Sequence, residues 1–371
     1  MPVGDWVART ANSAIAPPGS GSRRPSLGGP GHRSVDDRWS GRSGGDQGTS
    51  PDARPGAGRL GRVNSSLPAD RWPKTPFPRP TRWLVTGAGG LLGHEVTAAL
   101  AAEGVTAVAL DRRALDVTDP DALVEAFARH RPDLVVNCAA YTAVEAAEAD
   151  EARALRVNGD GPRQLAALCA RHGTRLLHLS TDYVFPGDAD SPYPEGHPTA
   201  PRNAYGRSKA AGERAVLALL PDLGAVVRTA WLHGAHGRSF VGVMAERARA
   251  GRTVDVVADL VGQPTWAADV ARLLLALGRT PGARGVFHAT NAGRASWYEL
   301  AREVFRLVGA DPGLVRPVPA AAVAGSASRP RYTVLGHDRW HEVGIPAPRP
   351  WREALAEALS AAPREEPDRP R

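Results

Sequence analysis

A short apolar segment that runs into a glycine-rich turn is the feature that most limits how this chain can fold. After residues 82–86, glycines follow at Gly87, Gly90 and Gly93, before a helix expected to reach Ala102. Gly87 permits a tight turn, Gly90 lets the backbone approach a diphosphate, and Gly93 lets helix pack on strand. Free N–H groups at the helix start would attract the phosphates. The arrangement predicts a dinucleotide-binding unit, and the alternative is an ordinary glycine-rich βα turn.

The residues that follow repeat this alternation of strand and helix. Further strands are expected at residues 107–110, 132–140, 176–180 and 224–229. Apolar strands separated by helices are typical of buried parallel sheets, so we expect an α/β fold with a Rossmann-type, doubly wound parallel sheet. After Trp231 the alternation loosens. This indicates a small C-terminal substrate-binding lobe, mainly from residues 231–260 and 286–350, within a reductase domain that spans 81–361.

The first 80 residues differ in composition from the rest. They are rich in Gly, Pro, Ser and Arg without sustained periodicity, so we expect a disordered leader that cannot bury enough apolar surface to fold. Residues 1–81 contain 12 Lys and Arg against 6 Asp and Glu, whereas the remainder contains 34 against 33. The folded part is therefore nearly neutral, which argues against nucleic-acid binding. The leader is either a basic binding arm or an over-long translation start, and we favour the second.

Cysteine usage and hydropathy indicate a cytoplasmic protein. Cys138 and Cys169 lie in apolar segments and are expected to be buried free thiols rather than a disulfide or metal ligands. No apolar run approaches the 18 residues that a membrane span needs, and the N-terminus lacks the apolar core of a signal peptide. Residues 362–371 form a charged tail that is expected to be frayed.

Charged residues at the end of the second strand bear on the choice of cofactor. Asp111 stands where an acidic side chain commonly holds the ribose 2′-OH of NADH. Arg112 and Arg113 follow directly, and an arginine here suits the 2′-phosphate of NADPH. Arg113 can equally belong to a polar loop. The sequence therefore leaves NADPH and NADH both open.

A tyrosine and a lysine four residues apart, Tyr205 and Lys209, lie on a helix predicted over residues 203–220. This spacing places both side chains on one helix face. A neighbouring ammonium is expected to lower the phenol pKa, which makes an acid/base pair. Lys209 is the only lysine after residue 81 in a chain with 46 Lys plus Arg, which indicates that a guanidinium cannot replace the ammonium. A solvated helix pair is the alternative.

The glycine loop, the segment Ser180–Phe185 and the Tyr205/Lys209 pair together resemble the extended short-chain dehydrogenases/reductases. Finer motifs resemble the dTDP-4-dehydrorhamnose reductase family within this class; they lie at residues 137–145, 228–231, 262–265, 295–301 and 329–335. The resemblance covers about residues 82–360. It implies reduction of the C4 ketone of dTDP-4-dehydro-β-L-rhamnose by NADPH or NADH, which gives dTDP-L-rhamnose.

The resemblance also implies roles for individual residues. Tyr205 would donate the proton, Lys209 would lower its pKa and hold ribose hydroxyls, and Thr181 would hydrogen-bond the ketone oxygen. Together with the loop and strand arguments, it gives a set of expected cofactor contacts: Gly87, Gly90, Leu91, Leu92, Gly93, Asp111, Arg112, Asp116, Val117, Ala140, Tyr141, Thr142 and Lys209. The expected substrate contacts are Val144, Thr181, Asp182 and Trp231. His178 and His288 are assigned no role in the chemistry.

Departures from the family keep other readings open. The family usually lacks such a leader, and Cys138 and Leu232-His233 stand where Ala and Val-Tyr are commoner. Some members hold magnesium at a dimer interface. No acidic ligand set is identifiable here, so magnesium is possible but not supported by the sequence, no metal ligands are assigned, and a homodimer stays open. The alternatives are a reductase of another dTDP-4-keto-6-deoxyhexose, a sugar-nucleotide epimerase or dehydratase, and a non-catalytic cofactor-binding regulatory subunit. The last would be expected to lose the tyrosine and lysine.

Overall fold

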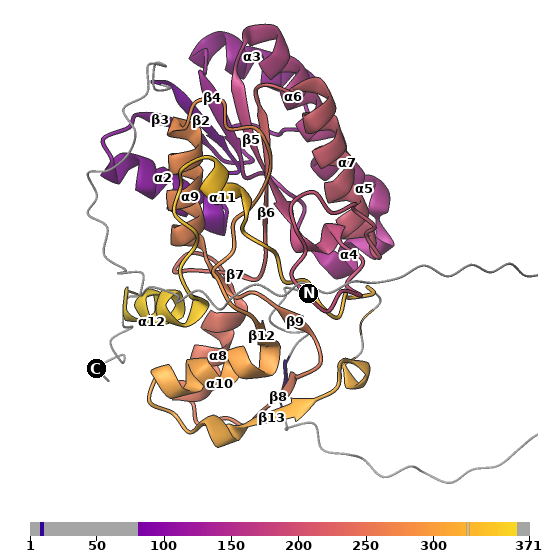
Figure 1. Ribbon diagram of the computed structural model, residues 1–371, viewed down its shortest axis with the longest axis vertical. Helices are drawn as coiled ribbons and strands as arrows, with labels where there is room; N and C mark the ends of the chain where they lie inside the picture. The colour runs from indigo at the N-terminus through magenta and orange to yellow at the C-terminus, as the bar shows by residue number, and fades with distance from the viewer. Residues whose placement is uncertain (1–7, 11–80, 324, 326, 362–371) are drawn as a thin grey trace, which may run out of the picture. The chain divides into compact units, whose positions relative to one another are not determined.

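A six-stranded parallel sheet organises the structure, a computed structural model that describes residues 8–10, 81–323, 325 and 327–361 (Figure 1). Its strands are Trp83–Thr86 (β2), Ala107–Leu110 (β3), Leu134–Asn137 (β4), Arg175–Thr181 (β5), Gly224–Thr229 (β6) and Gly285–His288 (β11). They lie in the order β3-β2-β4-β5-β6-β11, and every neighbouring pair is parallel. The order reverses at β2, which opens a crevice at the carboxyl ends of the strands. The predicted doubly wound sheet is confirmed.

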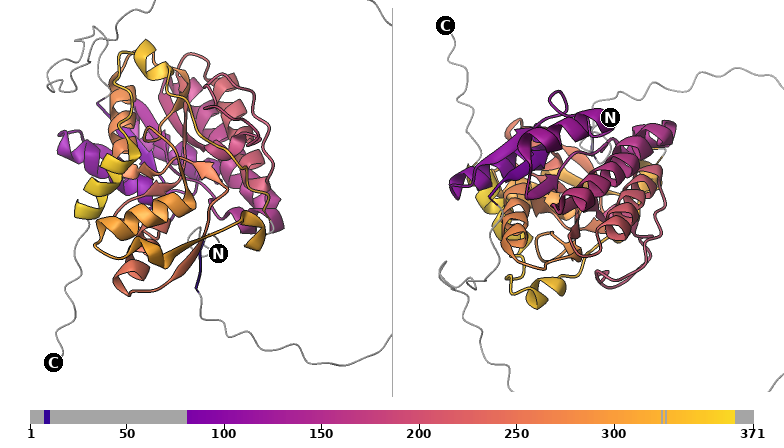
Figure 2. Two further views of the ribbon diagram at one scale, coloured as in Figure 1. Left: turned by 60° about the horizontal axis from the view of Figure 1, so that its bottom comes forward. Right: turned by 90° about the horizontal axis from the view of Figure 1, so that it is seen from above.

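Helices cover both faces of this sheet (Figures 1 and 2). They are Leu91–Ala102 (α2), Pro120–His130 (α3), Gly161–His172 (α6), Ala204–Leu219 (α7) and Ala267–Arg279 (α9). Val85 and Val136 pack with α2 and α9, whereas their neighbours Leu84 and Val135 pack with α3, α6 and α7. Successive strand residues thus face opposite helix layers. Because both layers bury the sheet, the strands read as nearly continuous apolar runs.

The helical region between β4 and β5 is interrupted. It begins with Val144–Ala149 (α4) and Glu151–Leu155 (α5), and a π-helical turn, Arg156–Asp160, leads into α6. Asp150 separates α4 from α5, and its side chain accepts a hydrogen bond from Arg153 N. An aspartate that caps one helix while ending another is a local signal for such a break.

The predicted C-terminal lobe has its own apolar core at the carboxyl end of the sheet (Figure 1). It contains Phe240–Arg249 (α8), Val254–Val257 (β8), Trp297–Leu307 (α10), Val315–Val318 (β13) and Trp351–Ala361 (α12). A capping box starts α10, with Ser296 and Glu299 each bonded to the other's backbone N–H. Two-residue strands join the lobe to the sheet: Leu232–His233 (β7), Val261–Gly262 (β9), Thr265–Trp266 (β10) and Ala295–Ser296 (β12).

The bounds expected for the lobe were partly wrong. β11 falls within the predicted range 286–350, yet it is the last strand of the central sheet and pairs with β6. Helix Arg339–Glu342 (α11) packs Trp340 against Phe287 of β11, with ring centroids 5.2 Å apart. A short apolar strand does not reveal from its sequence which sheet it will join. Three 3-10 turns complete the described elements: Asp182–Val184, Pro312–Leu314 and Ala320–Ala322.

Part of the leader is ordered, although no regular structure was expected there. Ala8–Thr10 (β1) pairs antiparallel with residues 254–256 of β8. The other leader residues and the tail 362–371 lie outside the described residues. No helix in the described part of the chain is long and apolar enough to cross a membrane.

Deletion of residues 1–80 is expected to leave the protein folded and active. The deletion removes β1, but β8 keeps its parallel partner β13 along its full length. We therefore expect a change in Tm of less than about 3 °C, since one short edge strand contributes little to a domain of this size. Thermal unfolding and turnover of the truncated chain are the measurements, and a large loss in either would show that the leader belongs to the fold.

Candidate active site

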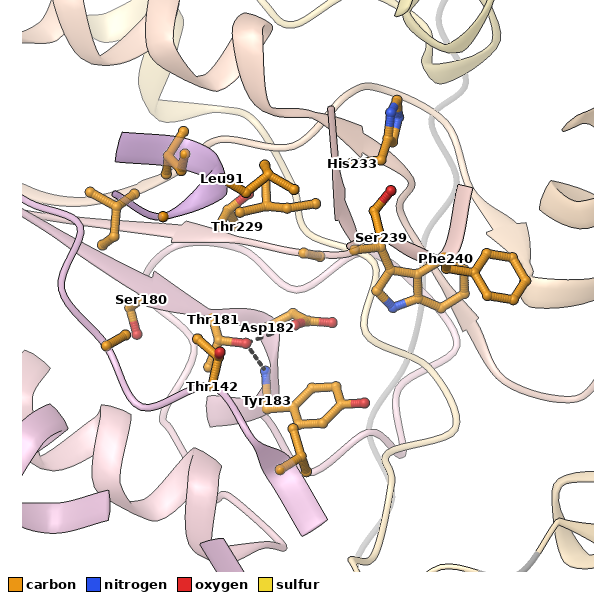
Figure 3. Close-up of a pocket in the computed structure, with 18 of the residues that line it drawn as sticks. Leu91, Thr142, Ser180, Thr181, Asp182, Tyr183, Thr229, His233, Ser239 and Phe240 are labelled. Atoms are coloured by element: carbon orange, nitrogen blue, oxygen red, sulfur yellow. Dashed lines mark hydrogen bonds between the residues drawn. The ribbon is translucent and has the colours of Figure 1, made fainter. Parts of the chain in front are cut away.

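A cavity of about 380 Å³ opens at the carboxyl ends of β2, β4, β5 and β6, between the sheet and the lobe. It gathers most of the predicted functional residues: Gly90, Leu91, Leu92, Gly93, Ala140, Thr142, Val144, Thr181, Asp182, Tyr205, Lys209 and Trp231. In Figure 3, Leu91 and Thr229 lie on one side, Thr181, Asp182 and Tyr183 on the other, and Ser239 and Phe240 at one end. The location agrees with the switch point of the sheet.

The glycine loop forms one wall of the cavity, and the structure explains why each predicted position is a glycine. Gly87 has φ of +66°, and a Cβ there would lie 2.5 Å from Ala139 N. At Gly93 a Cβ would lie 2.3 Å from the Gly87 carbonyl oxygen, so α2 packs directly on the loop. Gly90 precedes α2, which has no side-chain cap. The first N–H groups of α2 are thus left for a ligand, and this fits the diphosphate of a dinucleotide.

The other predicted cofactor residues do not line the cavity. Gly87 packs against the backbone of Cys138 and Ala139. Tyr141 precedes Thr142 in the connection between β4 and α4. Asp111 follows β3, on the far side of β2, and its carboxylate accepts hydrogen bonds from Arg113 N and Ala114 N. Arg112 reaches the Asp116 carboxylate at 3.7 Å, and Val117 is buried nearby. Their contacts with a cofactor stay predictions.

Tyr205 and Lys209 both face the cavity from α7, as their spacing predicts. Asn203 caps this helix by accepting a hydrogen bond from Gly206 N at 2.7 Å. The Lys209 side chain is buried, and its ammonium donates to the Leu179 carbonyl oxygen at 2.5 Å. Burial lowers the pKa of Lys209 to about 8, although the Glu213 carboxylate opposes this shift. The ammonium is held by backbone at the end of β5.

The predicted lowering of the Tyr205 pKa was wrong for this arrangement. Burial raises the pKa of Tyr205 to about 12, and the Thr181 hydroxyl offsets only part of the rise. The ammonium of Lys209 is directed to the Leu179 carbonyl, so burial of the phenol dominates. Tyr205 is therefore protonated at neutral pH, which is the form that a proton donor needs.

Thr181 and Asp182 form a hydrogen-bonded pair at the end of β5. The Thr181 hydroxyl donates to Asp182 Oδ1 at 3.0 Å and accepts from Tyr183 N at 3.3 Å (Figure 3). Asp182 Oδ2 is buried without a hydrogen-bond partner among the residues that the structure describes. Burial raises the pKa of this carboxyl to about 6, partly offset by the hydroxyls of Thr333 and Thr181. A hydroxyl donor from a ligand would satisfy Oδ2.

Asp182→Asn is expected to change how stability depends on pH. The folded state holds the Asp182 proton up to about pH 6, whereas the ordinary value is 3.8. The pKa is raised on folding, so the wild type loses stability as pH rises from about 4 to about 6. The Asn variant lacks this loss. Between about pH 4 and about pH 6, its free energy of unfolding should therefore rise by about 2–3 kcal/mol relative to that of the wild type. Denaturant unfolding of both proteins at pH 4 and pH 7 measures this change. The same difference in free energy of unfolding between variant and wild type at both pH values would contradict the prediction.

Several residues that were not among the predicted site residues also face the cavity. Ser180 Oγ, Thr229 Oγ1 and both ring nitrogens of His233 are buried without hydrogen-bond partners in the described part of the chain. Burial lowers the pKa of His233 to about 4, so its ring is neutral. Buried polar atoms are rarely left unpaired. They mark the cavity as a site for a polar ligand.

Two further polar contacts position α7, and neither was predicted. Asn158, in the π-helical turn, bonds both backbone groups of Tyr141 and donates to the Ser208 hydroxyl of α7. Arg228 at the end of β6 makes a bidentate ion pair with Glu213, at 2.8 Å and 2.9 Å, one turn beyond Lys209. Both partners of this pair are buried. A π turn inside a helical region is a known mark of functional sites.

The remaining candidate groups are not placed for chemistry. Cys169 is buried as predicted, but Cys138 is only partly buried because it lines the cavity. Burial raises the pKa of the Cys138 thiol to about 12, so it is not a nucleophile. His178 and His288 are fully buried in the core. Among the described residues no three His, Cys, Asp or Glu side chains cluster in a way that could hold a metal ion.

The parallel sheet, the glycine loop and the Tyr205/Lys209 pair beside it define an extended short-chain dehydrogenase/reductase. Comparison with known families narrows this class. The RmlD substrate binding domain family matches residues 81–363, and the chain belongs to that family.

Relatives and solved structures agree with this membership. A dTDP-4-keto-6-deoxy-D-glucose reductase from Streptomyces niveus is 55% identical over 75% of this chain and 96% of its own. A dTDP-4-dehydrorhamnose reductase from Streptomyces griseus is 54% identical over 77% of this chain and 95% of its own. The crystal structure of dTDP-4-dehydrorhamnose reductase from Bacillus anthracis in complex with NADP is 34% identical with a TM-score of 0.73, covering 76% of this chain and 99% of that one.

Proposed function

We propose that this chain reduces the C4 ketone of dTDP-4-dehydro-β-L-rhamnose to give dTDP-L-rhamnose, with NADPH or NADH as reductant. The observation that carries the proposal is that one cavity joins the uncapped start of α2 to Tyr205, Lys209 and Thr181. The relatives' activities support a nucleotide-sugar ketone as substrate. The related structure that contains NADP supports the cofactor class.

The residues fit a nicotinamide dinucleotide. The N–H groups at the start of α2 would receive its diphosphate, and Lys209 would hold hydroxyls of the nicotinamide ribose. Asp111 and Arg112 would lie at the adenosine end, where they bear on the choice between NADH and NADPH. When bound, the cofactor supplies the hydride that attacks the carbonyl carbon.

The chain's own residues handle the proton and the developing charge. Tyr205 is protonated because burial holds its pKa near 12, and it gives its proton to the ketone oxygen as negative charge builds there. The Thr181 hydroxyl donates to Asp182 Oδ1 in the structure, and it would turn its one O–H to the same ketone oxygen. Asp182 Oδ2 has an open acceptor position for a sugar hydroxyl, while Val144 and Trp231 would contact the nucleotide sugar.

A second candidate substrate belongs to the same class. The relative from Streptomyces niveus is named for dTDP-4-keto-6-deoxy-D-glucose, and its identity to this chain equals that of the dehydrorhamnose enzyme to within one per cent. The two sugars differ in stereochemistry, not in the reacting ketone, so the proton donor would serve both.

Oxidation of NADPH and NADH with a panel of dTDP-4-keto-6-deoxy sugars tests the proposal. We expect turnover with dTDP-4-dehydro-β-L-rhamnose and dependence on added reductant. Product formation without added reductant would indicate an epimerase or dehydratase instead, and no turnover with any sugar of the panel would refute a reductase. Unpaired cysteines support a reducing compartment such as the cytoplasm; a homodimer stays a prediction.

A further inference from the structure

Trp231 lies where the central sheet passes into the lobe, and its backbone conformation is unusual. It follows β6 by two residues and has φ of +43°. Residues with a bulky side chain rarely occupy this left-handed region. Such a conformation persists only where the surroundings over-determine it, and it occurs preferentially at ligand sites. The contacts around Trp231 therefore have to hold it in place.

Three contacts from segments distant in sequence surround this residue. Its carbonyl oxygen accepts a hydrogen bond from Thr265 N at 3.2 Å. Its ring stacks on Trp297, with centroids 3.6 Å apart and planes 13° from parallel. Its ring edge lies against Gly262, where a Cβ would come within 2.6 Å of ring atom Cε2 and 2.8 Å of Nε1. Backbone, ring face and ring edge are thus each fixed.

Gly262 and Trp297 are also held to one another. Strands β9 and β12 pair antiparallel, with Gly262 opposite Ala295, and Trp297 begins α10 two residues later. The Ser296 capping box fixes the first turn of α10. Phe240 of α8 packs edge-on against Trp297, with centroids 4.8 Å apart. Two of the sequence motifs, 262–265 and 295–301, therefore meet at Trp231. Neither motif contains Tyr205 or Lys209.

We propose that Gly262 and Trp297 are positioning residues that clamp the Trp231 indole as a wall of the substrate half of the cavity. The inference rests on the proposed function, in which Trp231 contacts the nucleotide sugar. The clamp acts on substrate affinity, whereas proton transfer depends on α7, whose cap and Lys209 contact come from other residues. Loss of the clamp should therefore raise KM more than it lowers kcat.

Gly262→Ala is the sharper of two test variants, since the added methyl must displace the indole. We expect KM for the sugar to rise about tenfold, with kcat within about threefold and the Kd for NADPH unchanged. Trp297→Leu removes the stacking partner and should raise KM by a similar factor. Gly242→Ala on α8 is the matched control, because a Cβ there would meet only Ser239 Oγ at 3.5 Å.

A third tryptophan provides a control for a rise in KM that comes only from a less stable fold. Trp351 is buried in the same apolar cluster of the lobe as Trp297. Its replacement by Leu should lower Tm at least as much as Trp297→Leu does, without raising KM. If Trp351→Leu raised KM to the same extent, the effect would follow stability and the clamp would be refuted.

A double-mutant cycle decides whether the two residues act through Trp231. In a Trp231→Ala background, Gly262→Ala and Trp297→Leu should leave KM unchanged, because the group they position is gone. A further rise in KM in that background, or unchanged KM in the single variants of an active enzyme, would overturn the inference and leave the proposed function standing. Absence of turnover in the wild-type chain would instead refute the proposed function, and the clamp with it.

Discussion

Tyr205→Phe is expected to lower kcat by about 10²- to 10⁴-fold while the Kd for NADPH stays unchanged. The variant removes only the buried hydroxyl, whose raised pKa of about 12 keeps it protonated as the proton donor. Phe conserves the ring that packs beside Ala204, so the helix should stay folded. Stopped-flow or steady-state NADPH oxidation gives kcat, and fluorescence titration gives the cofactor Kd.

Tyr183→Phe is the matched control for this experiment. Tyr183 also lines the cavity, and its ring lies edge-on to Tyr205 with centroids 5.9 Å apart. It lies on the 3-10 turn after β5, not on α7 beside Lys209. We expect removal of the Tyr183 hydroxyl to change kcat by less than about tenfold. Equal losses in both variants, or unchanged turnover in Tyr205→Phe, would remove Tyr205 from its assigned role.

The parts of the fold that the sequence predicted are those that local physics determines. Strands β3 and β6 have the predicted bounds and helix α2 ends at Ala102 as predicted, although it begins at Leu91, before Gly93. Buried strands need apolar runs, and helices need defined starts and stops. Asp119 caps α3 with Pro120 in its first turn, and both residue types favour these positions. The spacing of Tyr205 and Lys209 placed both on one face because helix geometry leaves no other outcome.

The parts that the sequence did not predict depend on contacts between distant segments. Thr229 lies in a family motif and His233 at a departure from it, but neither was assigned to the site, and only folding shows that their polar atoms are buried in the cavity. Nor could the direction of the Tyr205 pKa be predicted, since it depends on how deeply the phenol is buried and where Lys209 directs its ammonium. The stacking of Trp231 on Trp297 is likewise a tertiary contact between two separate motifs.

The structure gives the sequence signal at Lys209 a physical explanation. Lysine is absent elsewhere after residue 81, and the Lys209 side chain is among the largest that are fully buried. One donor direction is taken by the Leu179 carbonyl, and the Glu213 carboxylate is a neighbouring charge. A guanidinium brings five N–H donors in a fixed plane, which need partners when buried. This pocket is built for a compact ammonium.

Lys209→Arg is therefore expected to lower kcat/KM by about a hundredfold or more, although the positive charge is kept. Lys209→Met should cause a loss of similar size. The reverse exchange, Arg207→Lys, is the matched control. Arg207 pairs with Glu151 on the exposed side of the same helix, so this exchange should leave kcat/KM nearly unchanged. Activity of Lys209→Arg close to that of the wild type would show that charge alone matters. A loss of kcat/KM as large as that of Lys209→Met would show that activity depends on the shape of the cation as well as on its charge.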